Sequence, residues 1–391
     1  MNKFIRNKFI VGIIFFLIGV VLIGNNTSRI EENIPSITEA SMTSDKTVEG
    51  VKFSEFSAVS DILVKAKVTA YSEVLSEVST EYKKYEKPIK VILTDENHCT
   101  VYKKNFIKGG NFDSYSKGQG EKLAIISDKM SLELFKSYDA IGNKIIVLGE
   151  NYMVIGVYKT DDSFIGDISG DGVEQIIVPY TSYGKCEELL LNKMAVIHEE
   201  VNKSDFQYSL RKVVGETTDN YKVVDYKVGK STVIQIKYLV FFILGSILIV
   251  ILIKLLISII KKEYDRLLRH KDKYYFLDII KKERKSLIIT AVISIALIIG
   301  IVLIFNFIRF DLVAPEGYIP KDNIFDITFY KDTFIKNIQL INADSGFKLS
   351  SFDRYLSNAL LLQLFDGIVI LLSVISIMIS NYEFKLLKKN K

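Results

Sequence analysis

Four long apolar runs divide the chain, and polar segments of very different length separate them. The apolar runs cover residues 1–24, 238–260, 286–308 and 356–380. Each is long enough to cross the hydrocarbon core of a bilayer as a helix, which takes about 20 apolar residues. The polar segments are 25–237, 261–285, 309–355 and 381–391. The pattern therefore predicts an α-helical membrane protein with four transmembrane helices and one large polar domain between the first and second helices.

The segment 261–285 predicts the orientation, because it holds ten Lys or Arg against five Asp or Glu. Short loops rich in Lys and Arg stay on the cytoplasmic side of a membrane. The two ends of the chain, 1–8 and 381–391, are also basic. Four crossings place all three basic segments on one side, so we expect a protein of the bacterial plasma membrane with both termini in the cytoplasm. The apolar residues of 261–285 recur at helical spacing, and this favours an amphipathic helical hairpin.

The first apolar run allows two interpretations, a cleaved signal peptide or an uncleaved anchor. Phe9 to Gly24 is uncharged and follows three basic residues, as in both kinds of segment. The sequence after Gly24 lacks a small-x-small cleavage site, and no lipobox cysteine is present. We therefore favour an uncleaved first span.

The polar segment 25–237 shows strand and helix patterns in alternation, which predicts an extracytoplasmic α+β domain. Strands are expected at 89–93, 124–127, 145–148, 153–158, 175–180 and 222–226, with a hairpin turn at 149–151. Helices are expected within 54–85 and at 129–138, 186–200 and 204–214. Residues 30–50, rich in Ser, Thr and Glu, indicate a loose lead-in without regular structure.

A series of short motifs in this segment resembles one family. The chain has Gly109-Gly-Asn-Phe112, Leu123-Ala-Ile-Ile-Ser127, Leu134-Phe135, Ala140-Ile-Gly-Asn-Lys-Ile-Ile-Val-Leu-Gly149, Tyr152-Met-Val-Ile-Gly-Val-Tyr-Lys159 and Ile177-Val-Pro-Tyr180. In order and spacing they resemble the periplasmic core domain of MacB/FtsX-like ABC transporter permeases. The layout of one span, a large outer domain and three further spans is similar too. The glycines suit tight turns, and the alternating Ile and Val suit a strand core, so these residues are structural.

The resemblance implies a permease subunit in which movements of the extracytoplasmic domain follow ATP hydrolysis by a separate ATPase subunit. It implies a homo- or heterodimer of permeases that exports a peptide, lipoprotein or amphiphile, or regulates the envelope. No cofactor is expected on this chain, and ATP is expected on the partner. Gly229-Lys-Ser-Thr232 resembles the end of a phosphate-binding loop, but Val224 stands where its first glycine belongs.

The candidate coupling site lies in the basic loop, where four apolar residues interrupt the charges: Tyr274, Tyr275, Phe276 and Leu277. Aromatic side chains are common anchors of protein interfaces, so we expect the ATPase to dock here. The alternative is a helix lying on anionic lipid with its lysines extended toward the headgroups.

Three polar residues inside the spans are candidate functional groups: Asp366, Lys254 and Gln363. Asp366 is the only acidic residue within any of them, and a charge at that depth is costly, so it should face other helices. Its partner could be Lys254 in the second span or Gln363 one turn away, and the second would suit a neutral, hydrogen-bonded Asp366.

The net charge, the acidic residues, the histidines and the cysteines indicate which classes of function are not expected. The net charge of +5 is concentrated beside the apolar runs, which does not favour nucleic acid. Asp161 to Glu174 is acidic but lacks the spacing of a calcium loop, and the three histidines are scattered, so no metal site and no enzyme is expected. Cys99 and Cys186 could form a disulfide or remain free thiols. The alternative function is a membrane-anchored extracellular sensor or signalling protein without transport activity.

Overall fold

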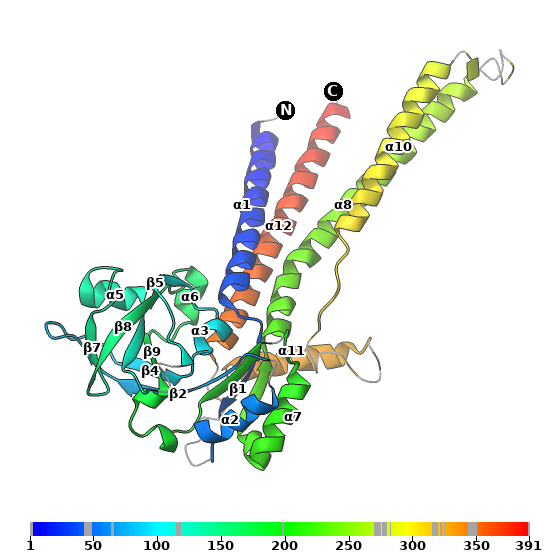
Figure 1. Cartoon of the computed structure of the whole chain (residues 1–391). Helices are drawn as coiled ribbons and strands as arrows, with labels where there is room; N and C mark the ends of the chain where they lie inside the picture. Colours follow the sequence, from blue (N-terminus) through cyan, green and yellow to red (C-terminus); the bar gives the residue numbers. More distant parts are fainter. Residues whose placement is uncertain are drawn as a thin grey trace. The chain divides into compact units, whose positions relative to one another are not determined.

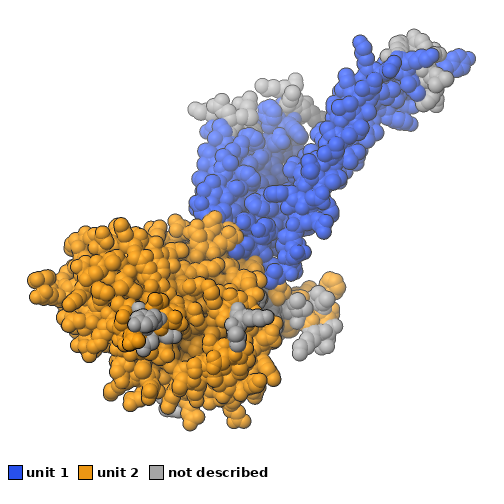
Figure 2. Space-filling model, in the orientation of Figure 1, with its two compact units in different colours: residues 1–25, 234–313, 362–391 blue, residues 26–233, 314–361 orange. Residues whose placement is uncertain are grey.

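The computed structural model describes residues 3–42, 49–63, 66–114, 119–197, 199–269, 275, 280–281, 283–314, 320, 323, 325–342 and 350–389 (Figure 1). The chain forms two compact units, coloured separately in Figure 2. The helical unit comprises residues 1–25, 234–313 and 362–391, and the sheet unit comprises 26–233 and 314–361.

Within the described residues, four helices are long and apolar enough to cross a membrane. They are α1 (Lys3–Asn33), α8 (Tyr226–Leu268), α10 (Arg284–Phe307) and α12 (Ser351–Lys389). Three of them, α1, α8 and α12, have residues in both units. These helices are longer than the expected spans because each continues past its apolar run into polar sequence that keeps helical geometry. The expected fold class, four membrane helices with an α+β domain between the first two, is confirmed.

The sheet unit is built on one mixed sheet of 11 strands in the order β11-β1-β10-β2-β4-β9-β6-β8-β7-β3, with β5 added to β8. Its strands are β1 (Ile37–Met42), β2 (Val68–Ser76), β3 (Val78–Ser79), β4 (Ile89–Thr94), β5 (Phe106–Gly109), β6 (Leu123–Ser127), β7 (Lys144–Val147), β8 (Glu150–Tyr158), β9 (Gln175–Pro179), β10 (Lys193–Ile197) and β11 (Tyr221–Asp225). The helices are α2 (Phe53–Ile62), α3 (His98–Val101), α5 (Asp128–Phe135), α6 (Phe164–Ser169), α7 (Lys203–Val214) and α11 (Ile327–Asn342).

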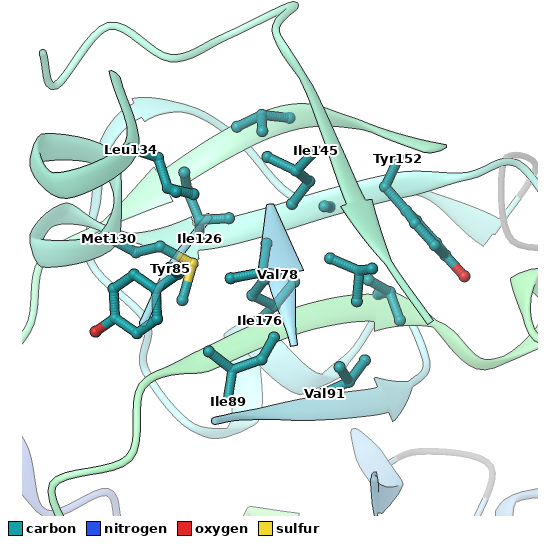
Figure 3. Packing of buried hydrophobic residues seen from close by; sticks show 14 of the residues in the cluster. Val78, Tyr85, Ile89, Val91, Ile126, Met130, Leu134, Ile145, Tyr152 and Ile176 are labelled. Carbon is teal, nitrogen blue, oxygen red and sulfur yellow. The ribbon is translucent and has the colours of Figure 1, made fainter. Parts of the chain in front are cut away.

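The sheet carries two apolar cores. In the first, Met130 and Leu134 of α5 pack over Ile126, Ile145 and other buried strand residues (Figure 3). In the second, α2 and α7 cover β1, β2 and β10, and Phe206 of α7 is completely buried. Each helix buries an apolar stripe against one stretch of the sheet, which is why the helical and strand periods alternate in the sequence.

Several local expectations were wrong. Residues 30–50 contain the end of α1 and strand β1, and residues 186–200 contain a short 3-10 turn followed by β10 instead of a helix. The helix expected within 54–85 is present as α2, and β2 and β3 follow it in the same segment. The hairpin turn lies at Leu148 and Gly149, both with positive φ, one residue earlier than expected. Positive φ at both central residues gives the strand twist that a two-residue hairpin needs.

Candidate functional site

Glu39 is a fully buried acidic side chain of the sheet unit, in β1 between β10 and β11. Lys193 of β10 places its Nζ 3.0 Å from Glu39 Oε1, and Ser41 Oγ donates a hydrogen bond of 2.9 Å to the same oxygen. Tyr102 OH donates to Oε2 at 2.7 Å. Both carboxylate oxygens are therefore satisfied, which is the condition for keeping a charge in a sheet interior.

An aromatic group lies beside this carboxylate. The rings of Tyr71 and Tyr102 meet edge to face, with centroids 5.7 Å apart, and His98 of α3 lies 4.6 Å from Tyr102. Burial, and then the negative charge of Glu39, raises the pKa of Tyr102, so its hydroxyl remains a donor. Burial, and then Lys104 and Lys193, lowers the pKa of His98, which keeps this imidazole neutral.

The residues that begin α12 join this group. Lys193 Nζ donates to Ser350 Oγ at 3.0 Å, so one ammonium group connects Glu39 with the start of the helix. Phe352 stacks on Tyr102 with ring centroids 6.0 Å apart and meets Tyr226 edge to face at 5.3 Å. We call Glu39, Tyr102, Lys193, Ser350 and Phe352 the Glu39 cluster.

The neighbouring ends of α1 and α8 are held in the same unit. Asn33 Nδ2 of α1 donates to Tyr355 OH of α12 at 3.2 Å. Lys230 Nζ of α8 donates to Ser36 Oγ at 2.9 Å and to Ile34 O at 3.2 Å, just after α1. These polar contacts lie within the sheet unit and join the parts of α1, α8 and α12 that belong to it.

The helical unit is packed through glycines. A Cβ placed on Gly19 of α1 would lie 2.6 Å from Ile370 Cγ1 of α12, and one on Gly12 would lie 2.9 Å from Ile377 Cγ1. A Cβ on Gly367 of α12 would lie 2.9 Å from Val240 Cγ2 of α8. Small residues allow helix backbones to approach closely, and this packing is a main source of helix association in membranes.

The predicted intramembrane residues fall in two environments. Asp366 and Gln363 of α12 are buried, at 3% and 0% exposure, and their spacing of three residues puts them on one face of the helix. Lys254 of α8 is exposed in the described structure. The burial of Gln363 and Asp366 is consistent with a shared polar interior, while Lys254 does not share it.

The predicted coupling residues are only partly described. Tyr275 is 87% exposed, and Tyr274, Phe276 and Leu277 lie outside the described residues. Around them α8 continues to Leu268 and α10 begins at Arg284, so the polar segment 261–285 is helical at both described ends. Arg266 donates to Glu263 Oε2 at 2.9 Å and also to Ser286 Oγ, which ties the end of α8 to the start of α10.

The acidic segment 161–174 contains α6, a short helix that the sequence did not predict. Ser163 caps it by accepting from Gly166 N, and Asp161 accepts from Ser163 Oγ at 2.9 Å. Asp171 is ion-paired with Lys90. Among the residues that the structure describes, no group of His, Cys, Asp and Glu side chains is arranged to hold a metal ion.

Both cysteines are free thiols, which settles the alternative left by the sequence. Cys99 is buried in α3, and burial raises its pKa to about 12. A thiol in that state is a poor nucleophile, because the thiolate is the reactive form.

The sequence did not indicate the Glu39 cluster. Glu39 stands among Ser and Thr residues that resemble a flexible linker, and Ser350 lies far away in the chain. The one available signal was the apolar, polar alternation of Ile37, Thr38 and Ala40, which is too short to separate a strand from a linker.

A four-span chain with a mixed α+β domain after its first helix has the domain architecture of a MacB-like ABC transporter permease. The family model described as "MacB-like periplasmic core domain" matches residues 10–220, more than half of the 391-residue chain. The chain therefore belongs to this family and is a multi-pass membrane protein with a periplasmic or extracellular domain.

Two solved structures are similar to the chain. The periplasmic region of MacB from Actinobacillus actinomycetemcomitans is 14% identical with a TM-score of 0.41, covering 52% of this chain and 94% of that one. The extracellular domain of the ABC-type transporter YknZ from Gram-positive bacteria is 17% identical with a TM-score of 0.38. The match covers 48% of this chain and 99% of that one. No curated protein matches the sequence significantly. The assignment rests on the family model.

Proposed function

We propose that this chain is the permease subunit of an ABC complex of the mechanotransmission type in a bacterial plasma membrane. A separate ATPase subunit hydrolyses ATP, and the permease passes the resulting helix movements to the extracytoplasmic sheet unit. The chain itself is not an enzyme and binds no cofactor. The observation that carries the proposal is the attachment of α12, a helix apolar enough to span the membrane, to the sheet through the Glu39 cluster.

The physical argument concerns how a displacement can be transmitted. A helix held only by a flexible linker can move without moving the domain that follows it. Here the first residues of α12 are fixed by a hydrogen bond to Lys193 and by stacking on Tyr102. A change in the position of α12 must then either move the sheet with it or break buried contacts, which is costly.

The ATPase would dock on the cytoplasmic loop through Tyr274, Tyr275, Phe276 and Leu277. The exposure of Tyr275 supports this role, because an aromatic side chain open to solvent is available to a partner. Both termini would be cytoplasmic, since the three basic segments then lie on that side. The complex would contain two permease chains, identical or different, and its cargo would be a peptide, lipoprotein or amphiphile, or its output the regulation of an envelope enzyme.

The test is purification of the full-length tagged chain from its native membranes in mild detergent. Co-purifying subunits are identified and their ATPase activity is measured. The variant Tyr274→Ala/Tyr275→Ala/Phe276→Ala changes the proposed docking residues. The matched control is Tyr82→Ala, which removes a tyrosine that is 91% exposed in the sheet unit.

We expect a nucleotide-binding subunit to purify with the parent and with Tyr82→Ala, and to be lost from the triple variant. If no ATPase accompanies the parent chain, the permease function is wrong and the sensor alternative takes its place. If the ATPase remains bound to the triple variant, the docking site is wrong while the function stands.

A further inference from the structure

The short helix α6 has one apolar face that no described part of the chain covers. Phe164 is 67% exposed and Ile168, one turn later, is 46% exposed. Their neighbours Ile165 and Ser169, also one turn apart, are each only 2% exposed and pack against the sheet unit. The helix therefore has a packed face and, beside it, an exposed face that carries a large aromatic and a large aliphatic side chain. We call Phe164 and Ile168 the α6 face.

Polar contacts hold α6 and its leading loop against two membrane helices, and all the residues involved belong to the sheet unit. Asn358 Nδ2 of α12 donates a hydrogen bond of 3.1 Å to Ser169 Oγ at the end of α6. Arg29 of α1 places a guanidinium nitrogen 3.8 Å from Asp162 Oδ1, just before α6. Figure 1 shows α6 beside the adjoining ends of α1 and α12.

The residues that contact α6 lie where these helices leave the membrane. Asn358 stands near the start of the apolar run 356–380 of α12, and Leu361, one turn further, is 63% exposed in the way of a lipid-facing side chain. Arg29 comes five residues after Gly24, the last residue of the apolar run of α1. At 1.5 Å per residue the backbone of Arg29 is about 7.5 Å beyond that run, which is the depth of the lipid headgroups.

We propose that the α6 face contacts the bilayer at the boundary between headgroups and acyl chains, in the leaflet that borders the sheet unit. A helix with its apolar face buried about 5–10 Å into that boundary is a common form of membrane contact. An isolated exposed apolar side chain needs no partner, but here two of them share a helix that is fixed beside the membrane boundary of α12. The inference depends on the chain being a membrane protein and does not depend on an ATPase partner.

The charges around α6 give it no preference for anionic lipid. Asp162 is occupied by Arg29, and Asp167 lies 3.9 Å from Lys129, so the loop has no surplus of positive charge to attract anionic headgroups. The contact is therefore apolar, with the acyl chains of any lipid, and it differs from a basic, anion-dependent surface. Adding anionic lipid should leave it unchanged.

The chain offers a direct probe, because it contains no tryptophan. The variant Phe164→Trp, as the full-length protein in nanodiscs, carries a single tryptophan on the α6 face. Its emission is compared in phosphatidylcholine and in phosphatidylcholine brominated near the top of the acyl chains, which quenches only by contact. The matched control is Tyr82→Trp, at a position that is 91% exposed between β3 and β4.

We expect bromolipid to lower the emission of Phe164→Trp about twofold, with a blue-shifted maximum in unbrominated lipid, since an interfacial side chain meets the acyl chains. Tyr82→Trp should show neither effect and should be quenched by aqueous iodide. Anionic lipid should not change the Phe164→Trp result.

Absence of bromolipid quenching in Phe164→Trp would overturn the proposal. A blue shift without that quenching would also overturn it, because the α6 face would then be covered by protein, either a second copy or a partner. The variant Ile168→Trp repeats the measurement on the same face and is expected to behave in the same way. Monodisperse elution of each variant establishes that it is folded, so failure of one substitution leaves the other as the test.

Discussion

Lys193 connects a completely buried carboxylate with Ser350, the residue immediately before the membrane helix α12. Its Nζ lies 3.0 Å from Glu39 Oε1 and donates to Ser350 Oγ at the same distance. The lysine side chain is 16% exposed and the glutamate side chain 0%. A pair in this environment contributes little net energy when intact, but removing one partner leaves the other charge buried and uncompensated.

Lys193→Met should therefore be strongly destabilising, by about 3–5 kcal/mol, because the buried Glu39 carboxylate loses its counterion. The measurement is the thermal unfolding of the purified full-length variant in detergent. The matched control is Lys122→Met, since Lys122 lies 2.7 Å from Glu150 with both side chains largely exposed, and its loss should cost no more than about 1 kcal/mol. The double variant Glu39→Met/Lys193→Met should be more stable than Lys193→Met alone, and strict additivity would contradict the coupling.

Asp95 should make stability fall as the pH rises. Burial raises its pKa to about 6, although hydrogen bonds from Ala70 N and Thr69 Oγ1 oppose the shift. The folded state holds the proton of the Asp95 carboxyl more tightly than the unfolded state does. The stability that Asp95 contributes is therefore fully present below about pH 4 and is lost as the pH rises through about 6. Between those limits the loss is about 3 kcal/mol. Asp95→Asn should remove this slope from the melting temperature measured against pH.

His98 should give a pH dependence of stability with the opposite sign to that of Asp95, so it serves as the comparison. Its pKa is lowered, chiefly by burial, and the stability that this contributes is present above about pH 6.5 and is lost as the pH falls. His98→Phe should flatten the acid side of the profile, whereas Asp95→Asn should flatten the loss toward neutral pH. Identical profiles for the parent and Asp95→Asn would show that Asp95 is not an ionising buried group.

Gly19 should not tolerate a large side chain. Its Cβ would meet Ile370, which is fully buried in α12, so Gly19→Leu should force α1 away from α12 at a cost of about 1–3 kcal/mol. The yield of monodisperse protein and its melting temperature are the measurements. Ile370→Ala should partly restore Gly19→Leu by making room. Gly24→Leu is the control, because no atom lies within 4 Å of its Cβ position. Equal losses in both glycine variants would contradict specific packing at Gly19.

Asp366 should tolerate replacement by asparagine better than by leucine. Its buried position next to Gln363 on α12 favours hydrogen bonding of a neutral side chain, and such a bond within a membrane bundle is worth about 0.6–2 kcal/mol. Asp366→Asn should keep the melting temperature near that of the parent, whereas Asp366→Leu should lower it. Lys254→Met should have no effect, because Lys254 is exposed. If Lys254→Met lowers the melting temperature as much as Asp366→Leu, the ion-pair alternative is correct.

The parts of the fold that local pattern determines were predictable. Each apolar run overlaps one of the four membrane helices almost completely, and the strands at 89–93, 124–127 and 175–180 fall where the Val and Ile pattern puts them. Strand β10 was not predictable, because Met194 and Ala195 favour helix and only pairing with β1 and β2 on both sides makes the segment a strand.

The candidate site was less predictable than the fold. Asp366 stands out because an acid inside an apolar run is unusual, and the structure buries it. Glu39 carries no such mark, because its burial depends on Lys193, Tyr102 and Ser350, which come from three distant parts of the chain. Local sequence does not indicate that a charged residue is buried when its counterion comes from a distant part of the chain.

The sheet order has a consequence for how the protein is made. Strand β1 emerges first from the membrane, but its two neighbours in the sheet are β10 and β11, which end at Ile197 and Asp225. The first core-forming strand therefore stays unpaired until nearly the whole domain has been translocated. The Glu39 cluster is completed only when Ser350 and Phe352 follow, after α8, α10 and α11. A long-lived nascent chain with an open strand edge is prone to misassembly. Synthesis of this protein should accordingly depend on factors that shield the translocated segment until its last strand arrives.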